Sequence, residues 1–352
     1  MTYKPLVLGE NLPPIRINLY SDTQTQPTGA MKDAMMTAVV GDEQSGTDPT
    51  VDALCDRVAD LLGKEAAVFL PSGTMCNVAA ILVHTRPGQE VIAHETSHIL
   101  MSEGGAHAAF SGVQICPLHG RRGQFVHETL EKARRPKVRH APEQALLSVE
   151  QTANLGGGTI WPLDQLNEVL EIAKSWGLST HMDGARLMNA VIATGVPAHV
   201  FAEHCDSVWI DFTKGLGAPL GAVLAGSAGF VGEAWRWKQR LGGAMRQAGI
   251  CAAACLYALD CHVERLADDH QNAKRLAEGL SRIPGLVVDP PDTNLVYFDP
   301  RLAGVETTDL VHRLRLDGVH VSMLQGRIRA CTHLDVTQSM VDEAVAAVKA
   351  QI

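Results

Sequence analysis

The chain has 352 residues, of which 46% are hydrophobic and 20% are charged, a composition that excludes a disordered or fibrous protein. Thirty Lys and Arg residues against 39 Asp and Glu residues give a net charge of −9, which argues against nucleic-acid binding. No apolar run reaches the ~20 residues of a membrane helix, and no secretory signal is recognisable at the N-terminus. We therefore expect a cytoplasmic protein without a membrane partner. Eight cysteines without a CxxC spacing predict reduced core thiols and no metal site.

Short strands rich in Val, Ile and Ala alternate with helical segments, which predicts an α/β fold with a mostly parallel central sheet. We expect an N-terminal arm over residues 1–18, a large domain over 19–260 and a small C-terminal α+β domain over 261–352. The large domain has a predicted helix over 50–63 and predicted strands over 66–70, 90–93, 114–116, 146–150, 179–183, 207–212 and 221–225. One long helix over 249–283 is predicted next, followed by strands over 286–288, 294–298, 319–323 and 327–331 and helices over 307–316 and 337–351.

The segment from His94 to His98 matches the HExxH pattern, in which two histidines one helical turn apart bind zinc and the glutamate acts as a base. Here the segment directly follows a predicted strand, and Met101 stands where the extended pattern requires glycine. A zinc hydrolase is therefore a distant alternative, and it predicts an activity that chelators abolish.

A candidate phosphate site lies at Gly73 and Thr74, between a predicted strand and a predicted helix. Free backbone N–H groups and the helix dipole favour an anion at such a junction. Ser72-Gly73-Thr74 is equally consistent with ordinary helix capping. No Walker or GxGxxG pattern follows a strand, so the sequence gives little support to nucleotide binding.

Asp183 and Lys214 both follow predicted strands, at the sheet edge where ligands of α/β proteins bind. A carboxylate in that position can pair with a pyridinium nitrogen, and a lysine can form a Schiff base with a carbonyl. Glycines on either side of Leu216 allow a flat ligand to approach the backbone. A phosphate site, an aspartate and a lysine in this order suggest pyridoxal 5'-phosphate as the cofactor.

Eight motifs resemble those of the threonine aldolases, which belong to the β-eliminating lyase group of fold-type I pyridoxal-phosphate enzymes. They occur in family order and extend nearly from end to end: Ser21 to Thr25, Gly46 to Val51, Pro71 to Asn77, Ser97 to Ile99, Asp183 to Leu187, Lys214 to Pro219, Gly242 to Gln247 and Thr332 to Val336. The resemblance implies the fold-type I architecture, with a large domain and a small C-terminal domain.

For the cofactor, the resemblance implies that Lys214 forms the Schiff base, Asp183 keeps the ring nitrogen protonated and His98 lies on the ring face. The phosphate would be bound by Gly73 and Thr74, together with Arg246, which in this family can come from a neighbouring subunit.

For the substrate, the resemblance implies that Ser21, Arg186 and Arg329 bind the carboxylate, because a guanidinium group suits bidentate carboxylate binding. Arg186 is also a candidate cofactor contact. Arg327 lies on the same face of the strand as Arg329, and Arg329 is preferred for its position relative to Thr332.

The implied reaction is a retro-aldol cleavage of L-threonine, L-allo-threonine or a related β-hydroxy-α-amino acid such as phenylserine, giving glycine and an aldehyde. His98 is the candidate base for the β-hydroxyl proton, directly or through a water. A histidine that only fixes the cofactor ring is an equal alternative. The resemblance also implies a homo-oligomer, a tetramer or a dimer, with shared active sites.

Two departures from the family pattern leave the substrate open. Many relatives have Glu-Asn-Thr-His-Asn where this chain has Glu150 to Asn154, with Ala153 in the place of the histidine. Ser45 replaces a common tyrosine. The alternatives are another pyridoxal-phosphate lyase or racemase on the same scaffold, because the same residues serve any bond at Cα, or a non-catalytic protein of this fold.

Overall fold

The computed structural model describes residues 12–352, which form two compact units. The larger unit contains residues 25–267, and the smaller contains residues 12–24 and 268–352. Their boundary lies in the first turn of helix α12 (Leu266–Ser281), a few residues beyond the domain boundary predicted at 260. Most of the predicted N-terminal arm lies outside the described residues. No helix of the described residues is both long and apolar enough to cross a membrane.

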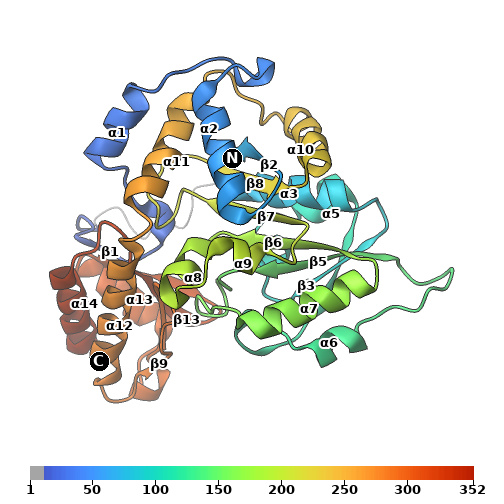
Figure 1. Cartoon of the computed structure of the whole chain (residues 1–352). Helices are drawn as coiled ribbons and strands as arrows, with labels where there is room; N and C mark the ends of the chain where they lie inside the picture. Colours follow the sequence, from blue (N-terminus) through green and yellow to red (C-terminus); the bar gives the residue numbers. More distant parts are fainter. Residues whose placement is uncertain (1–11) are drawn as a thin grey trace, which may run out of the picture. The chain divides into compact units, whose positions relative to one another are not determined.

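The larger unit contains a seven-stranded sheet (Figure 1). Its strands are β2 (Ala66–Leu70), β3 (Glu90–His94), β4 (Gln114–Leu118), β5 (Gln144–Glu150), β6 (Ser179–Gly184), β7 (Ser207–Asp211) and β8 (Ala222–Gly226). They lie in the order β2-β8-β7-β6-β5-β3-β4, and β8 alone runs against its neighbours. The prediction of a mostly parallel sheet in an α/β fold is confirmed.

The helices of this unit cover both faces of the sheet. They are α1 (Gly29–Met36), α2 (Pro49–Leu62), α3 (Gly73–His84), α4 (His98–Met101), α5 (Ala106–Ser111), α6 (His127–Lys132), α7 (Leu163–Ser175), α8 (Leu187–Thr194), α9 (Ala198–Ala202), α10 (Ala228–Arg240) and α11 (Gly249–Cys261). Alternate side chains of β2 separate the layers: Phe69 packs into the core with α2 and α7, while Val68 and Leu70 pack against α3 and α10.

The prediction of a single long helix over residues 249–283 is wrong. The chain forms α11 and α12 instead, and the break follows Cys261. The reason is tertiary: the side chain of His262 is buried, and its Nδ1 lies 2.7 Å from the carbonyl oxygen of Leu216. A hydrogen bond to so distant a residue leaves no trace in the helical periodicity.

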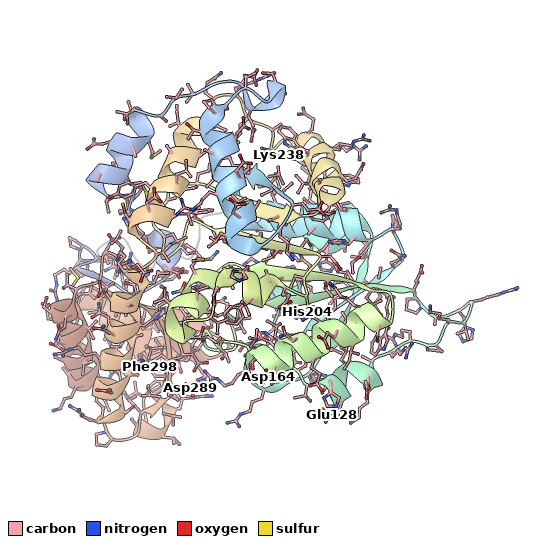
Figure 2. All side chains as sticks on the ribbon, in the orientation of Figure 1. Glu128, Asp164, His204, Lys238, Asp289 and Phe298 are labelled. Atoms are coloured by element: carbon pink, nitrogen blue, oxygen red, sulfur yellow. The ribbon has the colours of Figure 1, made fainter. Side chains whose placement is uncertain are left out.

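The smaller unit packs helices against antiparallel strands. Its elements are β1 (Ile17–Asn18), β9 (Val287–Val288), β10 (Leu295–Asp299), α13 (Thr307–Leu316), β11 (Val319–His320), β12 (Ser322–Leu324), β13 (Arg327–Cys331) and α14 (Gln338–Gln351), with most of α12. The sheet order is β12-β13-β10-β9, and β1 pairs with β11 in parallel. Phe298, labelled in Figure 2, and Ile328 are paired residues of β10 and β13 in its core. The predicted small α+β unit is present.

A buried ion pair in the larger unit holds a loop that carries a predicted site residue. Lys238 of α10 (Figure 2) pairs with Glu43, and both side chains are almost fully buried. The other oxygen of Glu43 accepts the backbone N–H of Met245 at 2.8 Å, and the backbone N–H of Glu43 donates to the carbonyl of Arg246 at 2.9 Å. Glu43 therefore ties the loop containing Arg246 to the body of the unit.

Replacing Lys238→Met should lower the free energy of unfolding by about 3–5 kcal/mol, because it leaves the Glu43 carboxylate buried without its cation. Urea unfolding measures the change. Arg57→Met is the matched control, since Arg57 pairs with Asp260 at an exposed position, and its loss should cost less than about 1 kcal/mol. Equal losses in the two variants would contradict this role for the buried pair.

Candidate active site

Parallel strands bring their carboxyl ends to one edge of the sheet, and several polar side chains of the larger unit lie at these ends. His94 ends β3, Glu150 ends β5 and Asp211 ends β7, while Asp183 is the penultimate residue of β6. This edge is where α/β sheets bind ligands. The topology therefore gathers segments that are more than a hundred residues apart in the sequence.

The N-terminus of α3 offers unused hydrogen-bond donors at this edge. Ser72 caps the helix, its hydroxyl accepting the N–H of Met75. The N–H groups of Gly73 and Thr74 have no acceptor among residues 12–352. A Cβ at Gly73 would lie 2.2 Å from the Trp209 ring, so only glycine lets the helix start so close to β7. These free donors and the helix dipole suit a phosphate.

Asp183 is a buried carboxylate whose position is fixed by hydrogen bonds. Its Oδ1 accepts the N–H of Ala185 at 3.1 Å, and its Oδ2 accepts the side-chain amide of Asn77 at 2.9 Å. The same amide nitrogen donates to Glu103 Oε1 at 2.7 Å. One amide group thus bridges two buried carboxylates.

The orientation of the Asn77 amide follows from its other neighbours. The indole Nε1 of Trp209 can only donate, and it lies 2.8 Å from Asn77 Oδ1. His181 Nε2 lies 3.1 Å from the same oxygen, so it also donates. Burial lowers the pKa of His181 to about 3, with a contribution from His84, which keeps this histidine neutral. The amide nitrogen must therefore face Asp183 and Glu103.

Lys214 lies in the turn after β7. Its ammonium group pairs with Asp211 Oδ2 and lies 5.8 Å from the centre of the Trp209 ring. The Lys214 side chain is 17% exposed and that of Asp211 is 3% exposed. The amine is therefore close to the surface of the sheet edge and accessible to a ligand.

His98 is the first residue of α4, and its side chain is 37% exposed. Its backbone N–H donates to Glu150 Oε2 at 2.9 Å, and its Nδ1 lies 2.8 Å from Glu103 Oε1. Donor atoms of His98, Glu103 and Asp183 all lie within 4.8 Å of one another. The structure thus brings His98 and Asp183, two of the candidate site residues, into one cluster.

The surrounding carboxylates control the pKa of His98. Burial lowers the pKa of this imidazole, but the hydrogen bond to Glu103 and the charges of Asp183, Glu103 and Glu150 outweigh burial, so the net shift is upward. Burial raises the pKa of Glu150 to about 7, and the charge of Asp183 adds to this effect. Protons can therefore move near neutral pH in this cluster.

The two predicted arginines of the larger unit differ in environment. Arg186 precedes α8 and is buried, and its backbone N–H donates to the Gln151 carbonyl at 3.2 Å. The Arg246 side chain is 62% exposed and pairs with Asp42 at 2.9 Å. A Cβ at Gly243 would lie 2.3 Å from Met75 Sδ, so the loop leading to Arg246 packs on the first turn of α3.

Ser21 and Arg329 belong to the smaller unit. Arg329 of β13 donates to Ser322 Oγ at 3.1 Å and to the Tyr20 carbonyl at 3.0 Å. Because Tyr20 precedes Ser21 in the sequence, Arg329 is bonded to the backbone next to Ser21. Arg327 instead pairs with Asp289 (labelled in Figure 2) at 2.6 Å. Of the two arginines, Arg329 is the more buried.

The HExxH segment does not form a zinc site. His94 ends β3 and His98 starts α4, so they do not share a helix. His94 Nδ1 lies 2.8 Å from Thr96 Oγ1, and its Nε2 lies 3.1 Å from the Gly120 carbonyl. Glu95 pairs with His119 at 2.6 Å, in an exposed position. The distant zinc-hydrolase alternative is therefore wrong.

Sequence reasoning missed Glu103, Glu150 and the role of Asn77. Asn77 is the last residue of the Pro71 to Asn77 motif, but no role was predicted for it. Glu103 lies outside all eight motifs. The signal for Glu150 was its place at a strand end, the same signal that identified Asp183.

A family profile and two related sequences match this chain over most of its length. The profile of the beta-eliminating lyases matches residues 18–303. The low specificity L-threonine aldolase of Escherichia coli (strain K12) is 39% identical over 331 residues, which cover 94% of this chain and 97% of the relative. The alanine racemase TOXG of Cochliobolus carbonum is 32% identical over 333 residues, which cover 90% of this chain and 83% of the relative.

Solved structures give the fold. The Leishmania major threonine aldolase superposes with a TM-score of 0.80 at 22% identity, covering 95% of this chain and 99% of that chain. SPT with a PLP internal aldimine superposes with a TM-score of 0.70 at 20% identity, covering 95% of this chain and 86% of that chain. The architecture is therefore that of the fold-type I pyridoxal-phosphate enzymes. The chain itself belongs to the threonine aldolases of the beta-eliminating lyase family.

This family membership implies pyridoxal phosphate, and the residues present fit it. The helix α3 offers free N–H donors for a phosphate, and Asp183 offers a fixed buried carboxylate for a protonated ring nitrogen. Lys214 supplies a primary amine at the same edge. These three groups are the donor set that the cofactor requires.

Gly73→Ala should lower the free energy of unfolding by about 1–3 kcal/mol, because its Cβ overlaps the Trp209 ring. Gly29→Ala is the control: Gly29 also starts a helix, and a Cβ there meets nothing within 4 Å. That variant should be unchanged or more stable by up to about 1 kcal/mol. Urea unfolding separates the two cases, and equal effects would refute the close contact.

Glu150→Gln should flatten the pH dependence of stability. Because the pKa of Glu150 is raised to about 7, the folded state holds this proton more tightly than the unfolded state does. That contribution is full below pH ~4.5 and is lost as the pH rises through ~7. Between pH ~5 and ~8 the native chain should lose roughly 2–3 kcal/mol relative to the variant. Urea unfolding of the two cofactor-free proteins at several pH values measures this difference. If the free energy of unfolding changed equally with pH in both proteins, the raised pKa of Glu150 would be contradicted.

Proposed function

We propose that this protein is a pyridoxal-phosphate-dependent carbon–carbon lyase that cleaves L-threonine, L-allo-threonine or a related β-hydroxy-α-amino acid to glycine and an aldehyde. The observation that supports it most is the cluster at the carboxyl edge of the sheet, where His98 and Asp183 lie within one hydrogen-bond network. The E. coli relative, 39% identical over nearly the whole chain, is a low specificity L-threonine aldolase.

Each candidate site residue of the larger unit has a proposed role. Lys214 attaches the cofactor, and Gly73 and Thr74 bind its phosphate through their free N–H groups, with Arg246 or its copy from a neighbouring subunit. The buried carboxylate of Asp183 keeps the ring nitrogen protonated, because a cation in that position gains a fixed counter-charge. When bound, pyridoxal phosphate supplies an electron sink for the pair released at Cα.

His98 is the proposed proton acceptor for the substrate β-hydroxyl. Its imidazole is partly exposed, and its Nε2 has no hydrogen-bond partner among residues 12–352. Removing the hydroxyl proton drives cleavage of the Cα–Cβ bond and release of the aldehyde. A histidine that only fixes the cofactor ring would make the same contacts. The pH dependence of kcat distinguishes that role from the role of a base.

The substrate carboxylate is proposed to bind Ser21, Arg186 and Arg329. Buried guanidinium groups favour this assignment, because they bind a carboxylate through two parallel hydrogen bonds. Ser21 is buried as well, and its hydroxyl already accepts from Thr23 at 2.8 Å.

Two positions that depart from the family pattern, Ala153 and Ser45, carry small side chains. Ala153 is buried at a position where many relatives have histidine. Ser45 is exposed, and its hydroxyl lies 3.1 Å from that of Thr47. These features favour tolerance of bulky β-substituents such as the aryl group of phenylserine.

A racemase is the second candidate, because the alanine racemase TOXG is also similar over most of this chain. The same lysine and aspartate serve proton exchange at Cα equally well. The two candidates differ in their products: the racemase yields no aldehyde.

We also propose a cytoplasmic homo-oligomer. All eight cysteines are free thiols, as expected in a reducing compartment. Met36 and Val39 are 83% and 70% exposed, and burial of such apolar groups against a second copy is favourable.

The cofactor-loaded protein should release acetaldehyde from L-threonine and L-allo-threonine and benzaldehyde from phenylserine. Lys214→Ala should lose cofactor attachment and activity, and Asp183→Asn should lower kcat by about 10²–10³-fold, because it removes the charge facing the ring nitrogen. A coupled aldehyde assay and the absorption spectrum measure both effects.

Lys174→Ala, at a half-exposed position paired with Asp206, is the control and should keep full activity. Formation of D-alanine from L-alanine without any aldehyde would reject the aldolase in favour of the racemase. Full activity in Lys214→Ala would reject the role of the lysine.

A further inference from the structure

Glu103 lies outside every motif, yet it is the side chain that contacts His98 most directly. Its side chain is 1% exposed, and its Oε1 lies 2.8 Å from His98 Nδ1. The same oxygen accepts the amide of Asn77 at 2.7 Å. A buried carboxylate that receives two hydrogen bonds on one oxygen has a fixed position.

This geometry determines where His98 carries its proton. An ionised carboxylate only accepts hydrogen bonds, so His98 Nδ1 is the donor. Nε2 is then the basic nitrogen of the neutral ring, and it is the nitrogen without a partner among the described residues. A base whose second nitrogen is held by a carboxylate keeps one tautomer, and its protonated form is stabilised.

We infer that Glu103 is a positioning residue, which holds His98 with Nδ1 protonated and leaves Nε2 free to accept the β-hydroxyl proton of the substrate. This inference rests on the proposed function. The proton passes from the substrate oxygen to Nε2, and the positive charge that forms on the ring is balanced by Glu103. No other group needs to gain or lose a proton in this step.

Three carboxylates face the His98 imidazole: Glu103, Asp183 at the end of β6 and Glu150 at the end of β5. Glu103 alone is hydrogen-bonded to the ring, while Glu150 accepts the backbone N–H of His98. Replacing Glu103 should therefore affect the ring more than replacing Glu150 does. The backbone contact from Glu150 also keeps α4 in place when Glu103 is changed.

The test is Glu103→Gln in the cofactor-loaded enzyme, with Glu95→Gln as the matched control. Glu95 also pairs with a histidine, His119, but at an exposed position, and it is not among the carboxylates that shift the pKa of His98. Exchange of the imidazole C2 hydrogen with deuterium, followed by mass spectrometry of peptides, gives the titration midpoint of each histidine without substrate. The second readout is the pH profile of kcat with L-threonine.

In Glu103→Gln the His98 midpoint should fall by about one pH unit or more, because a charged hydrogen-bond partner is lost. Since the unprotonated ring is the base, the acid limb of the kcat profile should move to lower pH with it. The plateau of kcat should fall about tenfold or more, because the base is weaker, while KM changes little. Glu95→Gln should leave the His98 midpoint, the profile and KM unchanged.

An unchanged His98 midpoint and pH profile in Glu103→Gln would overturn the inference, even if activity fell. So would a lower midpoint with a full plateau of kcat. If Glu103→Gln does not fold, Glu103→Asp takes its place and should retain a raised midpoint with reduced kcat. If the native enzyme releases no aldehyde, the proposed function fails, while the midpoint still tests the contact between Glu103 and His98.

Discussion

The side-chain amide of Asn77 is the contact on which the site depends. It bridges Asp183 and Glu103 through one nitrogen, and its oxygen accepts from Trp209 and His181. Two buried carboxylates so close together repel each other unless donors stabilise both. The amide supplies these donors, and Trp209 prevents it from turning around. Helix α3 therefore provides free N–H groups for a phosphate and the anchor for the acidic cluster.

The network has a direction. His181 must donate to Asn77, so its Nδ1 accepts from Ser207, whose hydroxyl in turn accepts from His84 Nε2. Burial lowers the pKa of His84 to about 4 and keeps that ring neutral. Each donor in the chain thus points toward Asp183. The amide of Asn77 therefore presents its N–H group, and not its oxygen, to the Asp183 carboxylate.

The sequence predicted the parts of the site that follow from strand order. Asp183 and Lys214 could be identified because parallel strands place their carboxyl ends at a shared edge, and the strand-to-helix junction indicated Gly73 and Thr74. The family resemblance added His98 and Arg246. Glu103 could not be found in this way, because it contacts Asn77 from a turn before α5, and nothing in its local pattern shows a partner. Asn77 and Asp183 are 106 positions apart, so their pairing depends on packing of α3 on the sheet.

The same reasoning explains the error in the fold. Apolar periodicity continues from α11 into α12, and it therefore predicted one helix, but the buried hydrogen bond from His262 to Leu216 ends the first helix. Leu216 follows Lys214 in the turn after β7, so the break in the helix also fixes the segment that carries the lysine. A sequence pattern records which residues are buried, but the polar contacts that stop an element and position a reactive group come from distant parts of the chain. In this protein such contacts hold both Lys214 and His98 in place.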